Sequence, residues 1–453
     1  MGDFPMDLAN RREFLKRAGL GTAVISSLGG VVRADQQPET TVVQPVIPAI
    51  PFKPGKAKSV IQIWLWGGPS HLDMFDPKPE AGKEYFGQFE KPIDTTVSGM
   101  KFGNLLPLLA TQADKLSVIR SMTHGNNHHE TAAFMMQTGR EPGAGISYPN
   151  IGAIVSLFKG IDAGYDNPIP PYVVLTTGQG RFSESGFLGA RYKPFVTGGN
   201  PNQDPFLVSG FVVKGMTPKR QDYRRGLIKR FDILGHADPD NPVYDQLDTT
   251  VEHAYNLIQG DAVKTFDLST ENPAVRDKYG RTTFGQSCLM ARRLVEAGVP
   301  YITINSSGWD THKKHFEAMN KKLPEFDMGV ASLIEDLAAR HLLDTTIIWA
   351  CGEFGRTPKV DPNPPWFGGR HHFGACFSVM VAGGGFKGGQ ILGASDEKAE
   401  KVVDRPVYPQ DLLGSILELM GINPDAPLPN TRGYDVPVML APSEKGRLQE
   451  IMV

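Results

Sequence analysis

Residues 60–66 read Val60-Ile-Gln-Ile-Trp-Leu-Trp66 and lead directly into Gly67-Gly-Pro-Ser-His-Leu-Asp73. A short, continuous apolar run of this kind is typical of a strand that is buried on both faces, as in a parallel sheet. The two glycines allow the backbone to pass close to a bound group. We therefore expect Asp73, or else His71, to reach a metal above the sheet; the alternative is an ordinary turn that Asp73 caps.

Five later runs of β-branched and apolar residues have the same character, at 116–120, 172–175, 301–304, 345–349 and 377–381. Helical segments are predicted between or after them, at 283–298, 314–340 and 409–420. A helix that leads into a buried strand, as 283–298 leads into 301–304, indicates a βαβ arrangement. The sequence thus predicts an α/β three-layer sandwich with a mostly parallel central sheet, whose ligands gather at the carboxyl ends of the strands.

Histidines cluster after the predicted strands. Eight of the chain's 11 histidines fall in four short windows, and each window also supplies carboxylates. The histidines are His71, His124, His128, His129, His312, His315, His371 and His372, and the carboxylates are Asp73, Asp76, Glu130, Asp310 and Glu353. Neutral imidazole and carboxylate together are ligand chemistry for zinc, manganese or another divalent cation. The alternative is that these are ordinary surface or core histidines.

The second window leads through Asn126-Asn-His-His-Glu130 into a helix that ends at Thr138-Gly139-Arg140. The asparagines can cap this helix, which would place His128 and His129 at its N-terminus. Backbone N–H groups at a helix N-terminus also attract anions. We therefore expect a metal and an anionic substrate to meet there.

The first residues of the chain predict export. Residues 10–16 read Asn-Arg-Arg-Glu-Phe-Leu-Lys and precede a weakly apolar run at 18–32, which indicates a twin-arginine signal over 1–34. An ordinary secretory signal and an uncleaved anchor are the alternatives, although the run is short for a membrane span. An extended linker is predicted at 35–57 and a single domain at 58–453. We therefore expect delivery by the twin-arginine export machinery to the periplasm or the extracellular space.

Composition excludes several classes of partner. The net charge of −2 offers no cluster of cations, so we expect no nucleic-acid partner. No second long apolar run is present, so we expect no stable membrane span in the mature protein.

The three cysteines, Cys288, Cys351 and Cys376, have no CxxC spacing. Disulfide bonds are therefore not expected to organise the fold.

Several motifs carry a resemblance to a known family. They are Gly67-Gly-Pro-Ser-His-Leu-Asp73, Ala291-Arg-Arg-Leu-Val-Glu-Ala-Gly-Val299, Gly308-Trp-Asp-Thr-His312 and Gly352-Glu-Phe-Gly-Arg-Thr-Pro358. With Thr138-Gly139-Arg140, they resemble the sulfatase-like domain-of-unknown-function family 1501, within the alkaline phosphatase superfamily. The resemblance extends over nearly the whole chain, signal included, and implies an alkaline phosphatase/sulfatase-like fold.

The resemblance also implies a metal site. Asp310 and His312 resemble the Asp and His of the superfamily's first metal site, and His372 resembles the late histidine that completes it. Glu353 stands where an Asp-His pair usually occurs, with Phe354 in place of the histidine. Asp73 is the candidate for the early aspartate. The implied cofactor is a divalent metal, zinc or manganese, with calcium and magnesium as alternatives, and one or two ions.

Position 129 departs from the superfamily pattern. Nine residues before Thr138, where sulfatases carry cysteine or serine and phosphatases carry serine or threonine, this chain has His129. That histidine is expected either to bind metal or to act as the nucleophile, and formylglycine chemistry is disfavoured because the chain has no Cys-x-Pro-x-Arg segment. Arg356 or Arg370 is expected to balance the charge that develops on a phosphate or sulfate. A salt bridge is the alternative for Arg356.

These features favour an exported metal-dependent hydrolase of phosphate or sulfate esters that uses a metal-activated water. The substrate is expected to be a small molecule or a glycan. Four tryptophans flank the ligand windows and would suit a sugar ring, although core packing explains the two in the first strand equally well: Trp64, Trp66, Trp309 and Trp366. The main alternative is a non-catalytic, metal-containing binding or surface-complex protein. A third is a structural protein whose polar loops hold no metal.

Overall fold

The computed structural model describes residues 52–209 apart from 90 and 144, isolated positions between 220 and 227, and residues 262–453 apart from 431, 432 and 434. The predicted export signal at 1–34 and most of the predicted linker at 35–57 lie outside the described residues. Within the part of the chain that is described, no helix is both long enough and apolar enough to cross a bilayer.

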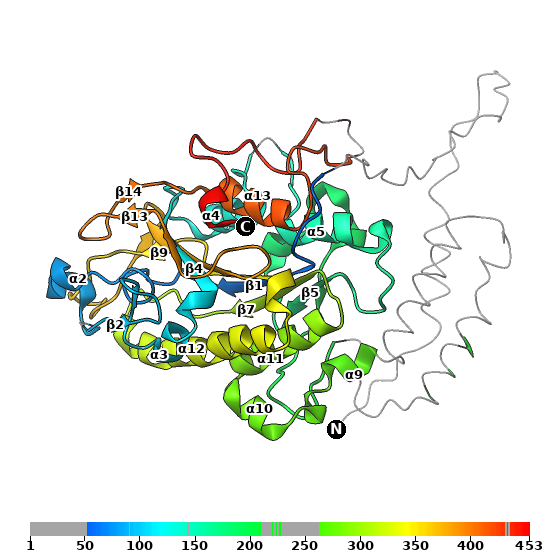
Figure 1. Cartoon of the computed structure of the whole chain (residues 1–453), viewed down its shortest axis with the longest axis horizontal. Coiled ribbons are helices and arrows are strands. Elements are labelled where there is room, and N and C mark those ends of the chain that lie inside the picture. Colours follow the sequence, from blue (N-terminus) through cyan, green and yellow to red (C-terminus); the bar gives the residue numbers. More distant parts are fainter. Residues whose placement is uncertain are drawn as a thin grey trace, which may run out of the picture. The chain divides into compact units, whose positions relative to one another are not determined.

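An eight-stranded sheet lies at the centre of the fold (Figure 1), with the order β12-β4-β11-β8-β1-β7-β5-β6. All six predicted strands are present in it. The strands are β1 Ser59–Leu65, β4 Leu116–Met122, β5 Tyr172–Leu175, β6 Phe195–Val196, β7 Tyr301–Ser306, β8 Thr346–Cys351, β11 Phe377–Ala382 and β12 Gln390–Leu392. Central β1 pairs in parallel with β7 on one side and with β8 on the other.

The sheet is mostly parallel, as predicted, and β11 is the exception. This strand pairs antiparallel with both β4 and β8. It reverses direction because the connection at 352–376 returns to the edge of β8 without a helix that would cross over the sheet. The same connection contains a small antiparallel pair, β9 Gly355–Arg356 and β10 His372–Phe373.

Helices cover both faces of the sheet, which confirms the predicted three layers (Figure 1). One face carries α3 Pro107–Ala110, α11 Thr283–Glu296 and α12 His315–Ala339, and the other carries α4 His129–Thr138, α5 Ile151–Lys159 and α13 Pro409–Leu419. The three helices predicted from periodicity correspond to α11, α12 and α13. Shorter elements complete the described residues: α2 Lys83–Phe86, α9 Ala262–Phe266, α10 Pro273–Lys278, and the paired strands β2 Ile93–Asp94 with β3 Lys101–Phe102 and β13 Ala394–Ser395 with β14 Val402–Asp404.

Strand β1 is buried along its whole length because it supplies both cores. Ile61 and Ile63 pack toward α11 and α12, whereas Trp64 packs toward the opposite helices. The one polar residue in its centre, Gln62, donates a hydrogen bond to Gln137 (3.1 Å) and accepts one from Thr303 (2.9 Å). Its burial is therefore compensated. The result is a fixed central strand whose carboxyl end lies between the ends of β7 and β8.

Candidate metal centre

Loops that follow three strands meet at the carboxyl edge of the sheet. Asp310 follows the end of β7, Glu353 follows the end of β8, and His129 begins α4 after β4. His372 lies in β10, within the long connection after β8. The topology therefore brings together residues that are far apart in the sequence, as expected for an open parallel sheet.

The carboxylate of Asp310 is the centre of a group of three imidazoles. Its Oδ1 lies 3.1 Å from His312 Nε2 and 3.2 Å from His372 Nε2. Its Oδ2 lies 3.3 Å from His129 Nε2. The Nε2 atoms of His312 and His372 are themselves only 2.8 Å apart. Four of the six predicted metal ligands thus converge.

The other ring nitrogen of each imidazole is held by an acceptor. His129 Nδ1 donates to Glu353 Oε1 (2.5 Å), and His372 Nδ1 donates to the carbonyl of Asn127 (2.8 Å). His312 Nδ1 donates to His371 Nδ1 (2.9 Å). With the Nδ1 atoms engaged, the Nε2 atoms of the three rings are directed at Asp310. Imidazoles that bind a metal are oriented in this way.

A relay behind His312 was not anticipated from the sequence. His371, whose Nδ1 accepts from His312, donates from Nε2 to Asp361 Oδ2 (3.3 Å). Trp366 packs beside both imidazoles. The adjacent histidines 371 and 372 signal a polar cluster, but no sequence pattern connects them to Asp361 or to the carbonyl of Asn127.

The charge of Asp310 sets the protonation of its neighbours. Hydrogen bonds with Asp310 and Glu353 raise the pKa of His129 to about 9. Burial by itself raises the pKa of Asp310, but hydrogen bonds from His129 and His372 and the charge of Arg356 bring this pKa well below its ordinary value. Burial lowers the pKa of His312. At neutral pH, the imidazole of His129 is therefore positively charged and that of His312 is neutral.

The donor set fits a small divalent cation. Single atoms of His129, Asp310 and His372 all lie within 4.8 Å of one another, and His312 Nε2 lies beside two of them. Tetrahedral zinc, with bonds of about 2.0–2.1 Å, keeps its ligand atoms about 3.3 Å apart. Imidazole nitrogen with one carboxylate oxygen suits zinc or manganese. Nitrogen and oxygen atoms that lie this close together are stabilised by a cation between them, or by a proton on His129.

Glu353 is placed behind His129 and does not join this group. Its side chain is fully buried, and both oxygens accept from the Gly67 N–H (3.0 and 3.1 Å). Gly67 has φ of +111°, and a Cβ there would collide with the backbone of Asp310. The glycine turn after β1 therefore positions both Glu353 and Asp310.

Arg356 is fully buried beneath the cluster. It forms an ion pair with Asp310 and donates to the carbonyls of Gly67, Gly68 (3.2 Å) and Arg370 (3.2 Å). The N–H groups of the guanidinium are therefore directed at acceptors within the protein. Contrary to the sequence expectation, Arg356 does not face the position of a phosphate or sulfate. The geometry corresponds to the alternative of a salt bridge.

The structure does not bring Asp73 to the cluster, contrary to the sequence expectation. Its carboxylate lies 2.6 Å from His315 Nε2 and 3.1 Å from Arg370, and all three side chains are almost completely buried. Burial raises the pKa of Asp73, but the charges of Arg370 and His315 bring it well below its ordinary value. Arg370 is thus an ion-pair partner of Asp73 rather than a group that faces the metal centre.

The remaining predicted residues have other surroundings. His71 Nε2 donates to the carbonyl of Ala399 (2.9 Å), and His124 Nε2 donates to the carbonyl of Glu353 (2.7 Å). His128 is the N-cap of α4 without a side-chain capping bond, so the expected asparagine cap is absent. Of the tryptophans, Trp64 and Trp309 are buried in the cores, whereas Trp66 stacks on His129 with ring centroids 6.2 Å apart.

Comparisons with known proteins give the following matches. A family model described as "Protein of unknown function (DUF1501)" matches residues 57–450. No curated protein matches the chain. Similar solved structures include a protein in the alkaline phosphatase superfamily from Vibrio parahaemolyticus (10% identity, TM-score 0.39, covering 88% of this chain and 71% of that chain). They also include the alkaline phosphatase of the Antarctic bacterium TAB5 (11%, 0.36, 82% and 100%) and the PsFucS1 sulfatase from Pseudoalteromonas sp. (13%, 0.33, 83% and 69%).

Proposed function

This chain belongs to the DUF1501 family of proteins of unknown function, and from that premise we propose that it is an exported metal-dependent hydrolase of phosphate or sulfate esters of a small molecule or a glycan. The observation that carries the proposal is the convergence of three imidazole Nε2 atoms on Asp310 at the carboxyl edge of the sheet. We propose one divalent ion there, zinc or manganese, bound by His129, Asp310, His312 and His372.

A divalent ion held at this position would lower the pKa of a bound water toward neutrality and polarise an ester oxygen. The residues of the chain orient the site. Glu353 fixes the ring of His129, and Arg356 fixes the carboxylate of Asp310 from below. Removing partners of this kind costs about 10–100-fold in metal affinity or activity.

His129 is proposed as a metal ligand rather than as a nucleophile. Its Nδ1 is bonded to Glu353 and its Nε2 faces Asp310, so neither nitrogen is directed away from the cluster toward an ester. Water is then the attacking group. The same histidine also favours the second candidate function, a non-catalytic metal-containing binding or surface-complex protein, because position 129 carries none of the side chains that attack esters in related folds.

Hydrolysis assays on the purified full chain test the proposal. We expect p-nitrophenyl phosphate or p-nitrophenyl sulfate to be hydrolysed after addition of Zn²⁺ or Mn²⁺, and the activity to be lost with EDTA. Bound metal without turnover on any ester of such a panel would favour the non-catalytic protein. A melting temperature that does not respond to Zn²⁺ or EDTA would contradict both functions, because an ion bound only by the folded chain stabilises it.

Zinc binding is expected to release about one proton at pH 7. His129, with a pKa of about 9, must lose its proton to bind the ion, whereas Asp310 is already ionised and His312 already neutral. The release should fall toward zero as the pH rises through about 9. Isothermal titration calorimetry in buffers of different ionisation enthalpy measures it. A constant proton release across this pH range would contradict the assignment.

We also propose that residues 1–34 direct export through the twin-arginine pathway. Changing Arg11 and Arg12 together to lysine is expected to retain the protein in the cytoplasm of a bacterial host, because that pathway reads the arginine pair. Cell fractionation measures the effect, and sequencing of the exported form should find an N-terminus near Asp35. Arg17→Lys is the matched control. Unchanged export of the double variant would point to the ordinary secretory route.

A further inference from the structure

A cavity of about 610 Å³ lies beside the metal centre. Trp66 lines it and also stacks on the imidazole of His129. Ser306 and Ser307 line it from the end of β7, shortly before Asp310. The cavity and the metal centre therefore share the same edge of the sheet and the same strand ends.

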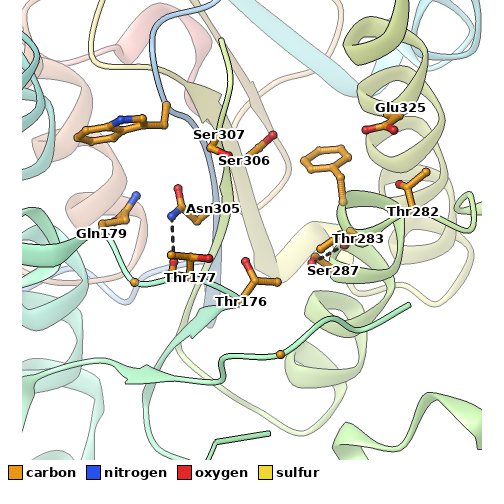
Figure 2. Close-up of a pocket in the computed structure, with 14 residues that line it drawn as sticks. Thr176, Thr177, Gln179, Thr282, Thr283, Ser287, Asn305, Ser306, Ser307 and Glu325 are labelled. Carbon is orange, nitrogen blue, oxygen red and sulfur yellow. Dashed lines mark hydrogen bonds between the residues drawn. The ribbon is translucent and has the colours of Figure 1, made fainter. Parts of the chain in front are cut away.

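The wall of the cavity is polar but almost uncharged. Figure 2 shows hydroxyl groups around it, together with the amides of Gln179 and Asn305. Of the described residues that line it, only Glu325 carries a charge. The hydroxyl groups are those of Thr176, Thr177, Thr282, Thr283, Ser287, Ser306 and Ser307. A wall without lysine or arginine does not suit a phosphate or sulfate group, which requires charged donors.

Two amides in this wall have unused hydrogen-bonding atoms. Gln179 is only 7% exposed, and neither atom of its amide has a hydrogen-bond partner among the described residues. Asn305 donates from Nδ2 to the carbonyl of Thr177 (2.9 Å), and its buried Oδ1 has no hydrogen-bond partner among the residues that the structure describes. Buried amides without partners cost stability. A side-chain amide can donate from its NH2 group to the oxygen of an alcohol and accept at its carbonyl oxygen from the O–H of an alcohol.

The backbone beside these amides is strained. Thr176, which also lines the cavity, has φ of +65°, a left-handed conformation that β-branched residues rarely adopt. Its N–H donates to Thr197 Oγ1 (2.9 Å), which holds the turn in place. Strain that is held in this way is found preferentially at binding sites.

We propose that this cavity binds an uncharged, hydroxyl-rich group, such as a sugar ring, which is the alcohol part of the ester whose charged end is held at the metal centre. The inference rests on the function proposed above. Gln179 and Asn305 supply the directed hydrogen bonds, and Trp66 supplies an aromatic surface next to His129. Glu325 disfavours a second anionic group in the cavity.

Binding of neutral disaccharides to the full chain in EDTA tests the proposal. We expect at least one of cellobiose, maltose and lactose to bind in a saturation-transfer NMR titration. Gln179→Leu should weaken this binding about tenfold or more. The same substitution should leave the melting temperature unchanged or raise it, because the amide has no partner to lose. Gln390→Leu, which makes the same change on the exposed part of strand β12, is the matched control.

The chelator separates the two proposals. Disaccharide binding without ester hydrolysis would support the cavity and remove the proposed hydrolase function. Ester hydrolysis without any disaccharide binding would overturn the cavity proposal alone. Undiminished disaccharide binding by Gln179→Leu would also overturn the cavity proposal. The same holds if the wild type binds inorganic phosphate in EDTA and Gln179→Leu abolishes that binding.

Discussion

Asp310→Asn is expected to remove the bound metal and the metal-dependent activity together. Among the described residues, Asp310 supplies the only carboxylate that the three Nε2 atoms face, and the amide of asparagine carries no charge to hold a cation among neutral imidazoles. Because partners behind a metal ligand are worth about 10–100-fold in affinity, loss of the central ligand itself should cost more than about 100-fold. Metal content after dialysis and the rate of ester hydrolysis measure the effect.

The free energy of unfolding of Asp310→Asn shows whether the loss of metal reflects a lost ligand or a misfolded protein. The buried guanidinium of Arg356 loses its charged partner, but asparagine retains an oxygen that can accept from it and position 310 is 40% exposed. We therefore expect a smaller decrease in the free energy of unfolding than for an ion pair in which both partners are buried. Asp94→Asn changes an 85% exposed carboxylate in a surface salt bridge and should leave metal, activity and stability unchanged. Stoichiometric metal in folded Asp310→Asn would show that the ligand group is wrongly assigned.

Asp73→Asn is expected to have the opposite pattern, with a large loss of stability and no loss of metal affinity in the folded protein. The substitution removes the charge that compensates Arg370, whose guanidinium is completely buried. Breaking a buried ion pair by removing one partner costs about 3–5 kcal/mol. Urea unfolding followed by circular dichroism measures this loss, and metal content is measured on the fraction that remains folded.

The pH dependence follows from the same ion pair. The pKa of Asp73 lies below its ordinary value in the folded chain, so its contribution to stability is present above the unfolded pKa of about 4 and is lost as the pH falls below it. The difference between wild type and Asp73→Asn should therefore be constant from pH 5 to 8 and shrink in acid. If the variant instead kept its stability and lost the metal, Asp73 would be a ligand after all.

The fold could be predicted from the sequence because six strands are continuous apolar runs, which only a sheet covered on both faces can bury. The direction of β11 could not. Its residues are as apolar as those of its parallel neighbours, and the reversal depends on the course of the connection before it. Local pattern identifies a strand, whereas pairing direction is set by the connection.

The convergence of four candidate ligands could also be predicted, because His129, Asp310, His312 and His372 follow strands whose carboxyl ends share one edge. Asp73 follows such a strand too, but the chain turns at His71, whose carbonyl accepts from the N–H groups of Phe75 (3.1 Å) and Asp76 (2.8 Å). That turn carries Asp73 to His315, away from the edge. Gln179 in the cavity had no sequence signal, because a single loop glutamine belongs to no periodic pattern.

The three imidazoles that face Asp310 belong to separate parts of the chain, and His312 and His372 are 60 residues apart. An ion held by all of them would act as a cross-link, and closing longer loops gives a cross-link a larger entropic effect. The connection at 352–376 would then be fastened to α4 through His372 and His129. If the chain binds its ion before the proposed export, the exported protein already has this connection cross-linked to α4. We then expect proteases outside the cell to cleave the connection faster once the ion is removed.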